Sequence, residues 1–270
     1  MIKLFVSDLD GTLLSFEKKV TEQDIAALKE LKENGVDVCL ASGRMDVEIG
    51  EILTMIGEKY HRISQNGAFI NTDNDESLHA LTFDNVIAKE VFEQVRSTDF
   101  ITIIADYSKN YTERRDEVIT GIESRMFSPI EENVNLLNAL GEDVKASKIT
   151  ILGEYEAISD LQKTLQERHP DTIETYISDK QCLDVMPKNI SKGNALKMLI
   201  EHLGIKPEEV ACIGDSFNDI PMFKMTPHSF TMEDALPEVK AQAAYTAATV
   251  HEAIKKVAEM NKTQLHSKVL

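Results

Sequence analysis

The sequence predicts an α/β protein with a doubly wound, Rossmann-like parallel-sheet core and an inserted α+β unit. In the first third, short apolar runs alternate with amphipathic stretches of helical length, and the last third returns to this pattern. Strands that alternate with helices in this way form parallel sheets with right-handed crossovers. The middle third mixes strands and helices differently. We therefore expect residues 1–82 together with 186–270 to form one core domain, and residues 83–185 to form the insert.

The first third carries the clearest signals for individual elements. Residues 2–7 form an apolar run that is soon followed by Gly11, which is typical of a buried strand. Residues 21–34 have apolar side chains at helical spacing, begin at the common cap residue Thr21 and stop before Gly35. The other elements expected here are strands at 36–41 and 62–64, a helix at 47–56 and a hairpin over 68–83.

The remaining two thirds are assigned by the same periodicities. In the middle third we expect strands at 100–105, 148–152 and 174–185, and helices at 84–97, 112–126, 131–140 and 155–168. In the last third we expect a helix at 194–202 and strands at 210–213, 229–232 and 245–246. Three loops rich in polar residues each come directly after a buried strand that we expect in the core.

Composition limits the classes of function. With a net charge of −17 and no block of Lys or Arg, the chain is expected to bind neither nucleic acid nor membranes. No run of about 18 apolar residues occurs, and the start of the chain does not resemble a signal peptide, so we expect a cytoplasmic protein. Cys39, Cys182 and Cys212 lie in apolar runs and are expected to be reduced core thiols. The oligomeric state stays open between a monomer and a weak homodimer.

The segment Asp8–Leu13 (DLDGTL) follows the first buried strand. Ligands of open α/β sheets bind at the carboxyl ends of strands, so the position favours a functional site. The carboxylates of Asp8 and Asp10 are separated by one residue and can converge on one cation, while Gly11 permits a sharp turn. An ordinary turn rich in Asp and Gly is the structural alternative.

Two further segments supply groups that suit a phosphate. Ser42, Gly43 and Arg44 follow the second buried strand, where a hydroxyl, exposed backbone amides and a helix start can cradle a phosphate. A serine that merely caps a helix is the alternative. Lys192 precedes Gly193 at the head of a helix, where its charge opposes the helix dipole. We therefore expect a phosphate or carboxylate partner for it, with a solvated lysine as the alternative.

The segment Gly214–Asp219 (GDSFND) follows a buried strand of the last third. Asp215 and Asp219 add two carboxylates, and Asn218 adds a neutral oxygen. Together with the carboxylates of the first motif they form an oxygen-rich set without His or Cys, which indicates Mg²⁺ rather than Zn²⁺. A loop that only caps a helix is the alternative.

The motifs DLDGTL, SGR, KG and GDSFND occur in this order, and with them the chain resembles the haloacid dehalogenase (HAD) superfamily. Within it, the chain is most similar to the Cof-type (subfamily IIB) phosphatases, which carry a large cap between the second and third motifs. Residues 1–66 and 186–225 carry the resemblance. It implies that residues 83–185 form a cap, and that the chain is a Mg²⁺-dependent phosphatase acting on a small phosphorylated metabolite, such as a sugar phosphate or a phosphorylated cofactor.

The resemblance also implies roles for single residues. Asp8 is the implied nucleophile, which forms an aspartyl-phosphate intermediate, and Asp10 the implied general acid and base, with Lys192 acting on the transferring phosphate. A carboxylate is ionised at pH 7 and needs no base, while a metal and a lysine offset its repulsion from phosphate. The candidate residues for phosphate or substrate binding are Ser42, Gly43, Arg44, Lys192 and Asn218. The candidate metal-binding residues are Asp8, Asp10 through its backbone carbonyl, Asp215 and Asp219.

Other functions remain open at this point. A phosphomutase of the same superfamily would transfer the phosphoryl group to a sugar hydroxyl instead of water. A non-catalytic protein that binds a phosphometabolite or Mg²⁺ is the alternative from a different class, and the acidic pair Glu233 and Asp234, which departs from the superfamily pattern, favours it slightly. A P-loop nucleotide hydrolase is excluded because no GxxxxGK[ST] occurs, and the absence of a GxGxxG after the first strand argues against a dinucleotide enzyme.

Overall fold

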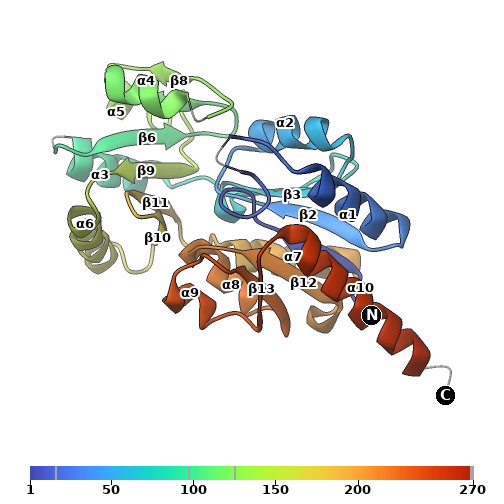
Figure 1. Cartoon of the computed structure of the whole chain (residues 1–270). Coiled ribbons are helices and arrows are strands. Elements are labelled where there is room, and N and C mark those ends of the chain that lie inside the picture. Colours follow the sequence, from blue (N-terminus) through green and yellow to red (C-terminus); the bar gives the residue numbers. More distant parts are fainter. Residues whose placement is uncertain (16, 97, 125, 268–270) are drawn as a thin grey trace.

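The computed structural model describes residues 1–15, 17–96, 98–124 and 126–267, and within them it places two β-sheets side by side (Figure 1). The core sheet has the strand order β14-β13-β12-β1-β2-β3-β4-β5. Its strands are β1 (Leu4–Ser7), β2 (Asp37–Ala41), β3 (His61–Ser64), β4 (Phe69–Asn71), β5 (Ser77–Ala80), β12 (Val210–Gly214), β13 (His228–Met232) and β14 (Tyr245–Ala247). The helices of the core are α1 (Glu22–Glu33), α2 (Asp46–Ile56), α7 (Lys192–Leu203), α8 (Ile220–Phe223), α9 (Pro237–Lys240) and α10 (Val250–Ser267).

The core sheet is doubly wound, as predicted. Strand β1 pairs in parallel with both β2 and β12. From β1 the chain moves to β2 and β3 in one direction, and from β12 it moves to β13 and β14 in the other. Right-handed crossovers therefore put α1 and α8 on opposite faces of the sheet. The direction of winding reverses between β1 and β12, and this switch point is where open α/β sheets bind their ligands.

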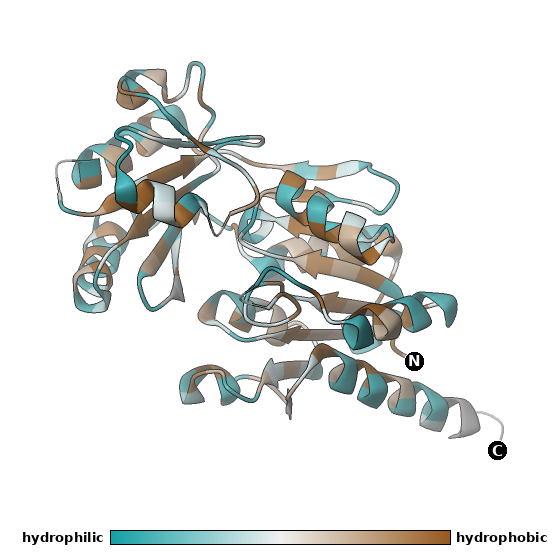
Figure 2. Ribbon diagram, turned by 45° about the horizontal axis from the view of Figure 1, so that its top comes forward, coloured by the Kyte–Doolittle hydropathy of each residue, from teal (hydrophilic) through white to brown (hydrophobic). Residues whose placement is uncertain are grey.

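Local sequence explains why the core elements form where they do. Residues Leu4–Ser7 are fully buried, as expected for a parallel strand covered on both faces, and Figure 2 shows apolar strands at the centre of the core. Helix α1 begins after Thr21, whose side chain accepts the backbone N–H of Asp24, so the predicted cap is confirmed. Within the described residues, no helix has both the length and the apolar character that crossing a bilayer requires.

The middle of the chain folds into a second unit around a mixed sheet with the strand order β10-β11-β9-β6-β7-β8. We call this unit the cap and define it as α3 through β11. Its strands are β6 (Ile101–Ala105), β7 (Asn110–Thr112), β8 (Ile130–Glu132), β9 (Lys148–Leu152), β10 (Ile173–Asp179) and β11 (Cys182–Pro187). Its helices are α3 (Asn85–Arg96), α4 (Glu117–Glu123), α5 (Leu136–Ala139) and α6 (Tyr155–Arg168). Strand β11 thus runs across the boundary expected between residues 185 and 186.

Three expected cap elements were wrong in detail. The single strand at 174–185 is a hairpin of β10 and β11, because the polar residues between them reverse the chain. The helix at 112–126 covers only Glu117–Glu123, and the strand β7 precedes it. The helix at 131–140 starts as β8, with only Leu136–Ala139 helical. Strands β7 and β8 pair with each other in parallel, so tertiary pairing outweighs the local helical pattern.

Candidate active site

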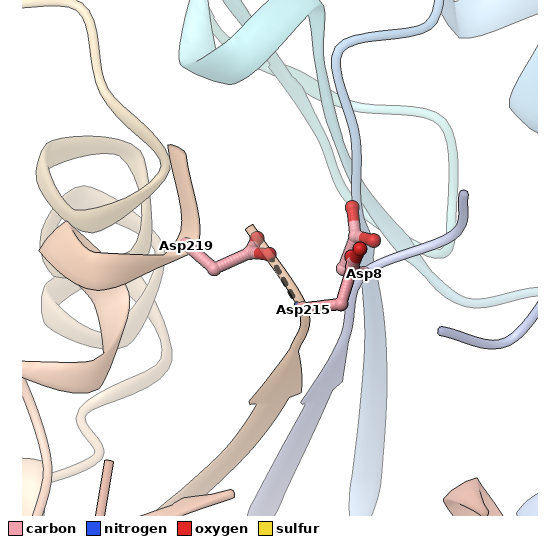
Figure 3. A group of neighbouring side chains, drawn as sticks. All are labelled: Asp8, Asp215 and Asp219. Atoms are coloured by element: carbon pink, nitrogen blue, oxygen red, sulfur yellow. Dashed lines mark hydrogen bonds between the residues drawn. The ribbon is translucent and has the colours of Figure 1, made fainter. Parts of the chain in front are cut away.

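The predicted motifs meet at the switch point of the core sheet. Asp8 follows β1, Ser42 follows β2 and Asp215 follows β12, while Lys192 opens α7. Figure 3 shows the side chains of Asp8 and Asp215 at the ends of neighbouring strands, with Asp219 on the far side of the loop after β12. The structure therefore brings together residues that are more than 200 positions apart in the sequence.

Asp8, Asp215 and Asp219 form an acidic cluster, in which each residue offers an oxygen within 4.8 Å of the others. Asp8 and Asp219 are buried, and Asp215 is half-buried. Burial raises the pKa of Asp8; Lys192 opposes this shift, and the two neighbouring carboxylates reinforce it. Burial and then the charge of Asp219 raise the pKa of Asp215 to about 7. Holding negative charges in this cluster therefore costs free energy, and a bound cation would reduce that cost.

Lys192 places an ammonium group inside the acidic cluster. Its Nζ lies 2.5 Å from Asp8 Oδ1 and 2.6 Å from Asp219 Oδ1. Burial by itself lowers the pKa of an ammonium, but the charges of Asp219 and Asp8 outweigh burial and raise the pKa of Lys192. A Cβ on Gly193 would lie 2.4 Å from Pro221 O, so glycine lets the start of α7 approach the loop that carries Asp219. The lysine thus has the carboxylate partner that its position at a helix start led us to expect.

Asp219 organises the loop after β12. Its Oδ2 accepts the backbone N–H groups of Asp215, at 2.9 Å, and Ser216, at 3.0 Å, while its Oδ1 contacts Lys192. A Cβ on Gly214 would lie 2.3 Å from Asp219 Cγ, so only glycine fits there. Both carboxylate oxygens of Asp219 are therefore occupied in orienting the lysine and the loop.

The first motif approaches Asp215 closely from the other side. Gly11 has φ +79°, in the left-handed region that favours glycine. A Cβ on Gly11 would lie 2.5 Å from Asp215 Oδ2, so the close approach also requires glycine. Thr12 Oγ1 donates to Asp215 Oδ1 at 3.2 Å. The Gly and Thr of DLDGTL therefore hold the loop after β1 against the loop after β12.

Asp10 lies outside the acidic cluster and pairs with Arg44. Arg44 Nε donates to Asp10 Oδ2 at 2.8 Å, and Arg44 Nη2 donates to Asp10 Oδ1 at 2.7 Å. The side chain of Asp10 is 55% exposed and that of Arg44 is 14% exposed. Arg44 is thus held by the carboxylate of Asp10, and its expected contact with phosphate or substrate stays a prediction.

The second motif forms a buried loop that the cap touches. Ser42 Oγ accepts the backbone N–H of Arg44 at 3.1 Å, and the Ser42 N–H donates to Ile63 O at 2.8 Å. The carbonyl of Gly43 accepts a hydrogen bond from Lys148 Nζ on cap strand β9, at 2.7 Å. Lys148 therefore brings a cap cation to the loop that carries the predicted phosphate-binding serine.

A chain of polar side chains links the cap to Asn218. Asp184 on β11 accepts hydrogen bonds from Thr150 Oγ1, at 2.8 Å, and from Asn66 Nδ2, at 3.1 Å. Because Asn66 uses its amide nitrogen on a carboxylate, its Oδ1 is left to accept from Asn218 Nδ2, at 3.1 Å. Asn218 Oδ1 has no hydrogen-bond partner in the described part of the chain. The predicted phosphate ligand Asn218 therefore contacts the cap network here.

Sequence reasoning missed Lys148 and Asp184. One signal was available for Asp184, which interrupts the apolar run of β11 and is buried. A buried carboxylate inside an apolar strand needs partners, so its presence predicts a polar contact. Nothing in the sequence indicates that one of these partners, Asn66, comes from the core. That contact depends on how the cap sits over the sheet.

The residues of the acidic cluster fit the Mg²⁺ that the motifs imply. All the candidate donors are oxygens, which are the ligands that Mg²⁺ prefers. Three carboxylates face one ammonium, so two negative charges in the cluster lack a partner cation when all of them ionise. Asp8 and Asp215 are better placed to bind a metal than Asp219, whose oxygens are already occupied.

An acidic cluster and a buried lysine at the switch point of a doubly wound sheet, beneath an inserted cap, define a capped α/β enzyme. The chain belongs to the haloacid dehalogenase-like hydrolases, since the model of that family matches residues 5–258. The HMP-PP phosphatase of Serratia proteamaculans is 30% identical over 243 residues, which cover 89% of this chain and 87% of the relative. The HMP-PP phosphatase of Escherichia fergusonii is 26% identical over 251 residues, covering 93% and 91%. A solved haloacid dehalogenase-like hydrolase from Bacteroides thetaiotaomicron has a TM-score of 0.83 and 25% identity, covering 95% of this chain and 100% of that chain.

Proposed function

We propose that this hydrolase is a Mg²⁺-dependent phosphatase that removes the phosphoryl group from small phosphate monoesters through an aspartyl-phosphate on Asp8. The observation that carries the proposal is the contact of a fully buried lysine with Asp8 inside an acidic cluster. An ammonium beside a nucleophilic carboxylate reduces its repulsion from an incoming phosphate. The HMP-PP phosphatases among the relatives support the same reaction class.

Asp8, Asp215 and the backbone carbonyl of Asp10 would hold the Mg²⁺, and Asp219 would support them. When bound, the ion supplies positive charge that offsets the charge of the phosphate and of the carboxylates. Lys192 supplies a further positive charge, since its ammonium group contacts Asp8 Oδ1. Ser42, on the buried loop after β2, would hold a phosphate oxygen through its hydroxyl.

In the first step an oxygen of Asp8 attacks phosphorus, and the bond between phosphorus and the ester oxygen breaks. The electron pair of that bond passes to the ester oxygen, which takes a proton from Asp10 and leaves as an alcohol. In the second step Asp10 accepts a proton from water as the water oxygen attacks phosphorus. The bond between phosphorus and Asp8 then breaks, which releases phosphate and restores both carboxyl groups.

The contacts of the cap support a small substrate. Lys148 of the cap contacts Gly43, next to the proposed phosphate ligand Ser42, and Asp184 of the cap contacts Asn66 of the core. A closed cap excludes bulk water during phosphoryl transfer, and it limits the size of the leaving group. We therefore propose a small phosphorylated metabolite as the substrate, and we infer no nucleic acid partner.

The test is phosphate release from a panel of phosphorylated metabolites, with Mg²⁺ and with EDTA. Wild type should release phosphate only with Mg²⁺, and Asp8→Asn should release none. Asp160→Asn is the matched control, because Asp160 is an exposed carboxylate on α6 of the cap. With a substrate labelled in its phosphoryl group, a single turnover quenched with acid should leave the label covalently bound to wild type but not to Asp8→Asn. Equal turnover by Asp8→Asn and wild type would overturn the proposal, and isomer formation without free phosphate would indicate a mutase.

A further inference from the structure

One aromatic residue of the cap packs against the core next to Arg44. Phe127 lies between α4 and β8, is half-buried, and packs against the hydrophobic cluster of the core. Its backbone N–H donates to Oε1 of the buried Glu48 on α2, at 3.0 Å. Lys18 Nζ lies 5.0 Å from the centre of the ring and donates to the carbonyl of Met126, at 2.7 Å. Side chains of the core thus contact both the backbone and the ring of this cap residue.

The other cation at the ring of Phe127 is Arg44. The guanidinium carbon of Arg44 lies 5.1 Å from the centre of the ring, within the range of a cation–π contact. The same guanidinium donates two hydrogen bonds to the carboxylate of Asp10. An arginine can rest on an aromatic ring while its N–H groups bind a carboxylate, so one side chain serves both contacts. A continuous set of contacts therefore runs from the cap through Arg44 to Asp10.

Among the residues that the structure describes, the hydrogen bonds to the Asp10 carboxylate come from Arg44. The side chain of Asp10 is more than half exposed, whereas Asp8 and Asp219 are buried. Two parallel hydrogen bonds fix the plane of its carboxyl group. One hydrogen bond from Arg44 is enough to tether Asp10 while its other carboxyl oxygen faces the ester oxygen of a substrate.

We propose that Phe127 is a positioning residue, which holds Arg44 in place when the cap is closed and thereby orients Asp10 for proton transfer to the leaving oxygen. This inference rests on the proposed function. The proton passes from Asp10 to the ester oxygen while the phosphorus–oxygen bond breaks and its electron pair stays on that oxygen. The contact would make proton donation efficient only when the cap covers the site.

The test compares two substrates that differ in their need for a proton. The p-nitrophenolate ion is a stable leaving group, so p-nitrophenyl phosphate depends little on a general acid, whereas glycerol phosphate has an alkoxide leaving group that requires protonation. General acids contribute about 10²–10⁴-fold to a rate. Phe127→Ala should lower kcat for glycerol phosphate by roughly tenfold or more, a part of that contribution. The fall for p-nitrophenyl phosphate should be much smaller, and KM should change little for either substrate.

Two further variants separate positioning from packing. Phe127→Leu keeps an apolar side chain on the core but lacks an aromatic face, so it should show the same substrate-dependent loss as Phe127→Ala. Phe127→Tyr keeps the face and should restore the wild-type ratio of the two kcat values. Tyr155→Ala, which removes an exposed aromatic from α6 of the cap, is the matched control and should leave the ratio unchanged.

Each outcome decides the matter. Equal loss of kcat with both substrates in the Ala and Leu variants, or no loss in either, would overturn the role of Phe127 while leaving the proposed phosphatase intact. Failure of wild type to release phosphate from these two substrates and from every ester of the metabolite panel would overturn the proposed function, and the inference with it. A loss of kcat that is much larger for glycerol phosphate than for p-nitrophenyl phosphate, with rescue by Phe127→Tyr, is the result expected.

Discussion

Replacing Lys192 with Met should strongly destabilise the folded chain when no divalent cation is present. The ammonium of Lys192 lies 2.5 Å from Asp8 and 2.6 Å from Asp219, and all three side chains are almost completely buried. Removing one partner of a buried ion pair costs about 3–5 kcal/mol, because the remaining charge stays buried without compensation. Since this substitution leaves two carboxylates behind, we expect a loss of ~5 kcal/mol, at the upper end of that range.

Urea denaturation in EDTA measures this loss as a change in the free energy of unfolding. In thermal unfolding, a chain of this size loses about 2–4 °C of Tm per kcal/mol, so Tm should fall by roughly 10–20 °C. Lys197→Met is the matched control on the same helix. The side chain of Lys197 is 62% exposed and 4.0 Å from Glu201, and exposed pairs contribute about 0–1 kcal/mol.

Saturating Mg²⁺ should restore part of the stability lost in Lys192→Met. A cation that binds the acidic cluster of the folded chain, and not the unfolded chain, stabilises the folded state by mass action. The bound cation would also reduce the repulsion between the carboxylates of Asp8 and Asp219, which Lys192 no longer separates in the variant. If Lys192→Met lost no more stability in EDTA than Lys197→Met, the premise that Lys192 compensates buried charge would be refuted.

Two more predictions concern the folded state. Gly193→Ala should lower the free energy of unfolding by about 1–3 kcal/mol and reduce activity, since its Cβ would meet the carbonyl oxygen of Pro221 at 2.4 Å. Gly50→Ala on α2 is the control, because its Cβ would meet no atom within 4 Å, and it should stabilise the fold slightly. Urea denaturation compares the two variants. Burial lowers the pKa of His61, so as pH falls through about 6.5 the unfolded chain binds this proton before the folded chain does, and the free energy of unfolding declines. His61→Gln should show a shallower decline in urea denaturation between about pH 7 and pH 5, and an unchanged slope would contradict this reasoning.

The core was predictable because its local signals agree with its tertiary structure. The strands Leu4–Ser7 and Val210–Gly214 are buried on both faces, so they appear in the sequence as unbroken apolar runs. The winding of the sheet follows from the alternation of strands and helices, since right-handed crossovers leave few other topologies. The predicted hairpin over 68–83 is confirmed by β4 and β5, which pair antiparallel.

The cap was less predictable because its short strands depend on distant partners. Asn110–Thr112 and Ile130–Glu132 have three residues each, too few to show a period, and each is extended because it pairs with a neighbour. By contrast, the helix expected at 155–168 matches α6 (Tyr155–Arg168), whose apolar residues repeat at helical spacing over several turns.

Some features of the candidate site were likewise predictable from the sequence, and others were not. That Asp8, Asp215 and Lys192 would converge was predictable, because two of them follow parallel strands and parallel strands end at one edge of the sheet. The pairing of Arg44 with Asp10 was not, since spacing along the chain does not reveal which side chains meet across a loop. The assigned roles in catalysis and in binding stay predictions until the variants above are measured.

The route by which the chain leaves the cap constrains how its parts can be exchanged. Strand β11 ends at Pro187 and α7 begins at Lys192, so only residues 188–191 separate the last strand of the cap from the buried lysine. Within this segment, Asn189 has φ 66°. A chimaera that borrows the insert of a relative should therefore keep residues 188–191 from the host, since a junction placed there would also displace the ammonium group on which the acidic cluster depends.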